Sequence, residues 1–172
     1  EPASRLRLEL LANCCRLAHR FFPQRVGLTQ ALGLNGESFV TVHITCKTDR
    51  FNLSVVGPDF INDCCFGEDF SNWLVSALSD GGVKADVICM EDYGWANHAE
   101  YAGNSYLMSV ASTPDEDPAR PNFGEWHVLL ERNRTFMQKL LGQNKGSSSD
   151  PIVGKVVGAL QGAGFADVRV EP

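Results

Sequence analysis

The chain has 172 residues, of which 44% are hydrophobic and 21% are charged, and its formal net charge at pH 7 is −6. This length and composition suffice for one hydrophobic core and are short for two ordinary domains. No apolar stretch reaches the roughly 18 residues that a membrane-spanning helix requires, and charged residues interrupt the N-terminal stretch where a secretory signal would be apolar. We therefore expect a cytoplasmic protein with one principal domain.

The charge is unevenly divided along the chain. Residues 1–50 contain seven Lys and Arg against four Asp and Glu, whereas residues 51–172 contain eight against seventeen. Binding to nucleic acid needs a basic face that displaces counterions from phosphates, so the acidic body argues against it. An acidic surface instead suits a protein partner with a basic surface.

Residues 5–22 repeat apolar side chains at helical spacing, with basic side chains on the opposite side, and Pro23 ends the run. Three interpretations are open: a helix that packs on its own domain, a basic helix that binds a partner or a membrane surface, and a segment without a stable fold. Because no Met precedes Met90, we expect residues 1–36 to be a helix and linker that are either disordered or not native to the chain.

Residues 37–172 have the pattern of a compact, acidic α+β domain. In chain order we expect strands at 39–46 and 50–56 with a hairpin turn at 47–49, a helix at about 68–80, strands at 83–90, 95–101, 106–111 and 125–131, a short helix at about 134–141, a helix that starts at Asp150-Pro151, and a final strand at 168–170. The succession of strands predicts a two-layer fold, a mainly antiparallel sheet with helices packed on one face.

The run GPDFINDCCFGEDFSNWL, followed by EDYGW and then by GEWHVLLERNR, resembles a group of small bacterial proteins that has no assigned activity. In that group an FG-D-WL helix start precedes an ED-aromatic-GW strand start. The resemblance covers residues 51–172 and omits the N-terminal stretch. It implies a compact domain and supplies no catalytic residue.

Cys64 and Cys65 are candidate reactive thiols, because they come just before the predicted helix at 68–80 and a helix N-terminus favours a thiolate. Acidic neighbours oppose that effect, so a structural role as two small buried groups competes with reactivity. Adjacent cysteines rarely bridge each other, since such a disulfide strains the linking peptide. We therefore expect reduced thiols, and metal ligation together with Cys89 lacks the usual spacing.

The stretch Glu91-Asp92-Tyr93-Gly94-Trp95 is a candidate binding rim at the entrance to a strand. Tyr and Trp offer flat surface with a polar edge, and the two acids add charge, so Glu91, Asp92, Tyr93 and Trp95 could contact a partner. The structural alternative is that Gly94 allows an unusual backbone turn and Trp95 fills the core.

Two pairs, His98 with Glu100 and Glu125 with His127, each lie two residues apart on a predicted strand and so share a face. Two His and two Glu could bind a divalent metal or act as acid and base. In a simple meander the intervening strand places the pairs roughly 9 to 10 Å apart, too far for one ion. A solvated polar face is the competing interpretation, and no metal or cofactor is expected.

These patterns favour a non-enzymatic protein-interaction module with a regulatory or protective role, acting through the open sheet face or the Glu91–Trp95 corner. The alternatives are an enzyme or metal-binding protein that uses His98 and His127 with nearby Glu, and a membrane-surface protein that uses residues 5–22.

Overall fold

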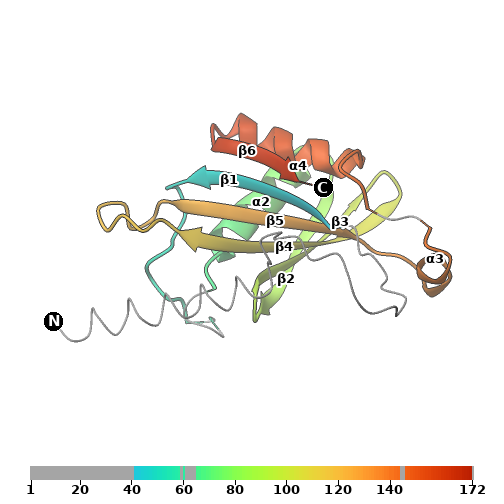
Figure 1. Cartoon of the computed structure of the whole chain (residues 1–172), viewed down its shortest axis with the longest axis horizontal. Coiled ribbons are helices and arrows are strands. Elements are labelled where there is room, and N and C mark those ends of the chain that lie inside the picture. The colour runs from blue at the N-terminus through green and yellow to red at the C-terminus, as the bar shows by residue number, and fades with distance from the viewer. Residues whose placement is uncertain (1–40, 59, 61–64, 144–145, 172) are drawn as a thin grey trace, which may run out of the picture.

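The computed structural model describes residues 41–171 apart from 59, 61–64 and 144–145 (Figure 1). Its elements are β1 (Val42–Thr48), α2 (Glu68–Asp80), β2 (Lys84–Glu91), β3 (Gly94–Tyr101), β4 (Asn104–Pro114), β5 (Gly124–Arg132), α3 (Phe136–Leu140), α4 (Pro151–Gly162) and β6 (Ala166–Glu171). The predicted helix at 5–22 lies outside the described residues, as does Cys64. No helix of the described part is long and apolar enough to cross a membrane.

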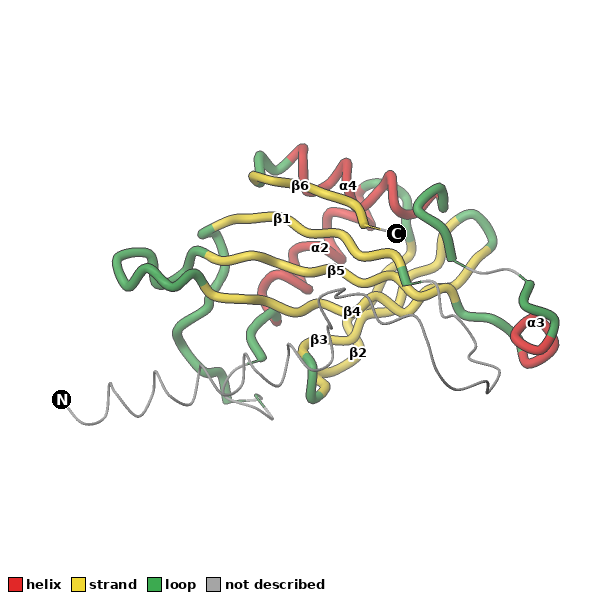
Figure 2. The backbone as a smooth tube through the Cα atoms, viewed as in Figure 1, coloured by secondary structure: helices red, strands yellow, loops and turns green. Residues whose placement is uncertain are grey.

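The six strands form one antiparallel sheet in the order β2-β3-β4-β5-β1-β6. Strands β2 to β5 follow one another as a meander, whereas β1 lies between β5 and β6 and so brings the first and last described strands side by side. Helices α2 and α4 both lie on one face of this sheet (Figures 1 and 2). The predicted two-layer α+β fold, with a mainly antiparallel sheet and helices on one face, is confirmed.

Local sequence sets the turns of the meander. Gly82, which follows the C-cap residue Gly81 of α2, has a φ of 80°, which stops the helix before β2 begins. Ala102 and Gly103 have φ values of 49° and 76°, so the β3–β4 hairpin closes through a two-residue left-handed turn. The strands predicted at 95–101 and 106–111 are thus joined by a hairpin, with Asn104 already paired to Tyr101 in the sheet.

The predicted strand at 50–56 and the hairpin turn at 47–49 are wrong, because residues 50–56 form bends and loop. Both edges of β1 are occupied, by β5 and by β6, so no edge remains for a hairpin partner. Asn52 also turns the chain: its Oδ1 accepts hydrogen bonds from the backbone N–H groups of Ser54 (3.1 Å) and Val55 (2.8 Å). Such local side-chain bonds compete with an extended strand.

Alternate residues of each strand point towards α2 and α4 and build the core. One row that crosses the sheet in register consists of Trp95, Val110, Val128, Ile44 and Val170. The three central members are fully buried, whereas Val170 on the β6 edge is 38% exposed. The core is therefore deepest under β4, β5 and β1.

An aromatic cluster fills one end of this core. Phe70 on α2 stacks on Trp126 of β5 with ring centroids 4.6 Å apart, and Phe51 packs edge-on against Phe70 at 5.0 Å. Trp73 and Phe165 complete the cluster, with their ring centroids 4.9 Å apart. Residues from the 50–56 loop, from α2, from β5 and from the α4–β6 connection thus meet, and Phe51 serves as a core residue although its segment is not a strand.

A buried amide fixes α2 to the sheet. Asn97 on β3 is fully buried, and its Nδ2 donates to Ser71 Oγ on α2 (3.3 Å) and to the backbone oxygens of Trp95 (3.3 Å) and Met108 (3.1 Å). Its Oδ1 has no partner among the described residues. A directional contact of this kind sets one position of the helix on an otherwise apolar surface.

Candidate functional site

The sheet face opposite α2 and α4 carries most of the polar side chains that the sequence singles out, and we call it the open face. Directly opposed residues of neighbouring strands share a face, so the register assigns its members. One row contains Asp86, His98, Leu107 and Glu131, and the next contains Ala96, Ser109, Leu129 and His43. No described helix lies on this face (Figure 2).

Acidic side chains outnumber basic ones on the open face. The acids are Asp86, Glu91, Glu100, Glu125, Glu131, Asp167 and Glu171, and the bases are Lys47, Lys84 and Arg169. Each base already has a carboxylate partner on the same face: Lys47 and Arg169 contact Asp167 (3.3 and 3.6 Å), and Lys84 contacts Glu100 (3.1 Å).

This pairing leaves four carboxylates of the open face, Asp86, Glu91, Glu125 and Glu131, without an ion-pair partner among the described residues. Asp86 and Glu91 are exposed, and Glu125 and Glu131 are half-buried. Between them lie Leu107 and Leu129, the histidines His98 and His127, and the alanines Ala96 and Ala111, which are only 4% and 5% exposed. The open face thus presents unpaired negative charge around a centre of apolar and histidine side chains.

Two histidines meet on the open face. His43 Nε2 lies 3.1 Å from His127 Nδ1, and the rings stack with centroids 5.2 Å apart. His127 Nε2 lies 3.1 Å from Thr113 Oγ1, and His43 Nδ1 lies 3.6 Å from Glu171 Oε2. The two facing nitrogens share one hydrogen, since a hydrogen bond between imidazoles needs one donor and one bare nitrogen.

The third described histidine, His98, lies next to a serine. Its Nε2 is 2.9 Å from Ser105 Oγ, which also accepts a hydrogen bond from Asn133 Nδ2 (2.9 Å). Glu100 Oε1 approaches the same Nε2 at 3.9 Å. In a serine-hydrolase triad the carboxylate holds the opposite nitrogen, Nδ1, and so orients the ring as a base. Serine and carboxylate here compete for one nitrogen, and the geometry is that of a surface hydrogen-bond cluster.

The alternative metal or acid–base set of His98, Glu100, Glu125 and His127 does not come together. His98 pairs with Leu107 and His127 pairs with Ala111, so the two histidines are separated across β4 and also by four positions along it. Those offsets correspond to roughly 10 Å sideways and about 13 Å along the strands. Within the described residues no group of three or more His, Cys, Asp or Glu is placed to hold a metal ion.

The Glu91–Trp95 corner divides into exposed and buried parts. Glu91 and Asp92 are exposed and Tyr93 is half-exposed, whereas Trp95 is 6% exposed and its Nε1 donates to Cys65 O (3.2 Å). Gly94 has a φ of 142°, and a Cβ there would clash with Val110 O. Gly94 and Trp95 therefore have structural roles, one as a backbone turn and the other as a core side chain. The exposed part of the candidate rim consists of Glu91, Asp92 and Tyr93.

The described thiols are not placed as activated nucleophiles. Cys65 Sγ donates to Asp92 O (3.3 Å), and α2 begins only at Glu68, so the thiol does not lie in the first turn of the helix. Burial and then the Glu125 carboxylate raise the pKa of the Cys46 thiol to about 12. Desolvation and then its Glu91 neighbour raise the pKa of Cys89, which lowers its thiolate fraction at neutral pH.

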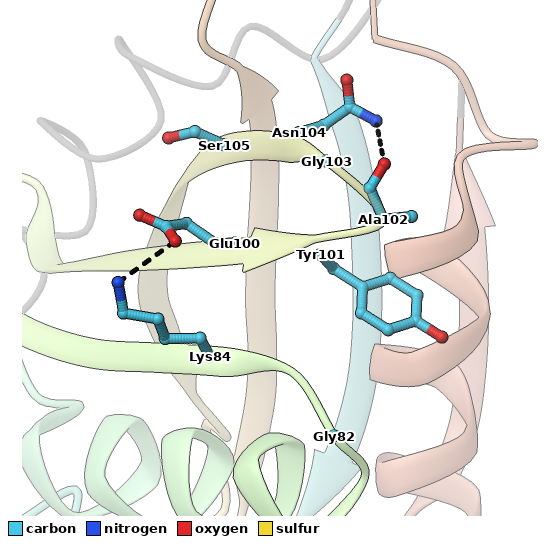
Figure 3. A pocket seen from close by; sticks show the side chains of 8 residues that line it. All are labelled: Gly82, Lys84, Glu100, Tyr101, Ala102, Gly103, Asn104 and Ser105. Atoms are coloured by element: carbon cyan, nitrogen blue, oxygen red, sulfur yellow. Dashed lines mark hydrogen bonds and ion pairs between the residues drawn. The ribbon is translucent and has the colours of Figure 1, made fainter.

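A cavity of about 470 Å³ lies at the β3–β4 turn, and its lining includes Lys84, Glu100, Tyr101 and Ser105. Figure 3 shows Lys84 and Glu100 pointing towards each other, while Tyr101 points towards α4, where Lys155 Nζ lies 5.3 Å from its ring centroid. The charged groups of the cavity thus neutralise one another, and they leave no net charge with which to attract an ionic ligand.

Reasoning from sequence did not connect His43 with His127, or His98 with Ser105. His43 lies on the strand predicted at 39–46, but its β5 partner is 84 positions away, and no local pattern reveals that pairing. The Ser105 contact could have been found, because the hairpin at residues 102–103 brings Ser105 back beside Glu100 and next to His98. Comparison of the chain with protein-family models, with curated proteins and with solved structures finds no match. The resemblance to the small bacterial group stays a prediction.

Proposed function

We propose that this chain is a non-enzymatic protein-interaction module, with a regulatory or protective role, whose open face binds a partner that presents a basic surface. The main support for the proposal is the set of unpaired carboxylates around a centre of apolar and histidine side chains. All three bases of the face are engaged by acids of the same face, whereas Asp86, Glu125 and Glu131 are not. Lysines or arginines of a partner would form ion pairs with those carboxylates.

The mixture of apolar and charged side chains on the open face supports a protein partner. Leu107 and Leu129 are half-buried and lie on adjacent strands, next to the small residue Ser109. Protein interfaces combine such a dry centre with a polar rim, and the centre contributes affinity while the charged rim speeds association. The Glu91 and Asp92 carboxylates at the end of the β2–β3 hairpin extend the acidic character towards one edge.

Both edges of the sheet are poor sites for addition of a partner strand, which favours binding through the face. The β2 edge is interrupted by a bulge between Val87 and Cys89, and the register between β1 and the β6 edge strand shifts between Thr45 and Lys47. Charged side chains line both edges. Bulges and charges are the devices by which sheets prevent edge pairing.

The test is affinity capture from a lysate of the source cells with three forms of the full chain. The open-face variant is Glu125→Gln/Glu131→Gln. It removes two negative charges and adds no positive charge beside Lys47. The matched control is Asp80→Asn/Glu116→Gln, which removes two charges from exposed positions at the end of α2 and in the β4–β5 loop. The wild type and the control should recover the same protein, and the open-face variant should lose it.

The recovered protein should then bind the purified open-face variant at least about tenfold more weakly than the wild type, and salt should weaken wild-type binding. Equal recovery by all three forms, or a loss with the control variant as well, would remove the open face from the proposal. Thermal melts monitored by circular dichroism check that the variants fold.

A further inference from the structure

The short helix α3 exposes apolar side chains that the fold leaves uncovered. Met137 is 58% exposed, Leu140 is 66% exposed and Leu141, just after the helix, is 59% exposed. Their spacing of three and four positions places them on one side of a helical turn. We call residues 133–142 the tip. Three large apolar groups gathered on one side of a turn form a patch, which single exposed residues do not.

The tip is also the basic part of an acidic domain. Between Glu131 and Asp150 the chain has no acidic residue, and it has four of the eight bases found in residues 51–172: Arg132, Arg134, Lys139 and Lys145. Arg132 is held by Asp150 (3.7 Å) in a mostly buried pair at the base of the tip. Along the sequence, Arg134 and Lys139 belong to the tip and Lys145 follows it.

The tip has a defined structure and stands apart from the body. Thr135 N donates to Gln138 Oε1 (3.0 Å) and Gln138 N donates to Thr135 Oγ1 (3.3 Å), a reciprocal capping box that holds the single turn. At its base Asn133 N donates to Ser105 O (2.9 Å). Figures 1 and 2 show α3 beyond the end of the sheet and away from α2 and α4.

We propose that the tip inserts Met137, Leu140 and Leu141 into the headgroup layer of a membrane that contains anionic phospholipids, with Arg134 at the lipid phosphates and the positive charge of Lys139 adding to the attraction. Basic residues beside exposed apolar ones are the combination by which peripheral proteins bind such surfaces. The acidic body is repelled from the same surface, and this repulsion orients the molecule with the tip towards the lipid.

Two other occupants fit less well. A helix that docks in a protein groove uses anchors over two turns or more, at i, i+3, i+4 and i+7, and α3 has only five residues. A contact between two tips would bury three side chains from each copy, far below the roughly 1,200 Å² of a stable interface, and would bring like charges together. A headgroup layer requires neither length nor matched shape.

The experiment is flotation of the full chain with vesicles of neutral phosphatidylcholine, and of phosphatidylcholine with 30 mol% phosphatidylserine. The wild type should float with the anionic vesicles only, and added salt should weaken its binding. Leu140→Asp/Leu141→Asp should abolish flotation. Arg134→Gln/Lys139→Gln should weaken it by roughly fivefold for each charge removed.

The matched control is Val55→Asp/Ile88→Asp, which changes two residues of similar exposure, 66% and 57%, away from the tip. It should float like the wild type, and so should Glu125→Gln/Glu131→Gln, which separates this proposal from the partner-binding role of the open face.

Absence of wild-type flotation with anionic vesicles would overturn the proposal. So would flotation that survives Leu140→Asp/Leu141→Asp but is lost in Leu10→Asp/Leu17→Asp, since residues 5–22 would then be the lipid-binding segment. Sedimentation velocity without lipid shows whether the chain forms a dimer. A dimer that only Leu140→Asp/Leu141→Asp dissociates would mean that the patch binds a second copy of the chain, and would overturn the lipid assignment.

Discussion

Gly94 shows how one residue decides the geometry of the β2–β3 corner. Its φ of 142° is a conformation that side-chain-bearing residues rarely adopt, and Val110 O occupies the space that a Cβ would need. The same corner positions Trp95 in the core and leaves Glu91 and Asp92 in solvent. A candidate binding rim is therefore built on a backbone position that only glycine fits.

We expect Gly94→Ala to lower the free energy of unfolding by about 3 kcal/mol or more, because strain and a backbone clash act together. Gly158→Ala is the control, since Gly158 is exposed on α4 and a Cβ there meets nothing within 4 Å. That control should raise stability by about 0.5–1 kcal/mol through helix propensity. Urea unfolding of both variants checks this, and a similar effect at the two positions would contradict the assigned backbone geometry.

Cys46 gives a prediction about pH. Its pKa is raised from 9.0 to about 12 by burial and then by Glu125, so the folded protein keeps the thiol proton at pH values where the unfolded chain releases it. The unfolded state then binds fewer protons, and stability falls as pH rises above 9. The loss should be roughly 1.4 kcal/mol per pH unit up to the folded pKa.

Urea unfolding of the wild type and of Cys46→Ala at pH 7.5, 9 and 10.5 isolates this contribution, because all other titrating groups are common to the two forms. The stability advantage of the wild type should shrink over the upper half of that range. Parallel stability profiles for the two forms would show that the Cys46 thiol is not held protonated by the fold.

At the scale of elements, the contact between α2 and β3 depends on one polar bridge. Asn97 Nδ2 donates to Ser71 Oγ within a region that is otherwise apolar. Asn97→Ala should cost about 2 kcal/mol, because it leaves the buried Met108 oxygen without this donor and opens a small cavity.

A double-mutant cycle with Ser71→Ala measures the bridge itself. The coupling energy between the two substitutions should be about 1 kcal/mol, as expected for residues in direct hydrogen-bonded contact. Strict additivity of the two single effects would mean that the Asn97 amide stabilises the sheet alone and does not hold α2 in place.

Elements with strong local signals were predictable from sequence, and pairings between distant segments were not. The stripe of apolar residues between Phe66 and Leu78 with its glycine stop identified α2, and Asp150-Pro151 marked the start of α4. The Asp150 carboxylate makes no cap hydrogen bond and pairs with Arg132, which propensity alone does not reveal. The prediction of a strand at 50–56 was wrong because β1 pairs with β5 and β6, so no strand edge was left for this segment to pair with.

For the molecule as a whole, the acidic composition predicted the sign of the surface but not its distribution. The register places unpaired carboxylates on the open face, while the tip at one end contains basic residues and no acidic residue. Two surfaces of opposite charge on one small domain suit two different contacts, one with a basic protein and one with an anionic surface. The total charge of −6 does not reveal this division.

Carboxylate footprinting tests whether the chain binds its proposed partner through the open face. Carboxyl groups of the wild type are modified with a carbodiimide and an amine, alone and in complex with the captured protein, and each site is quantified by mass spectrometry. We expect Glu125 and Glu131 to be protected in the complex while Asp80 and Glu116 react as before. Unchanged modification of Glu125 and Glu131, or protection confined to Asp80 and Glu116, would contradict it.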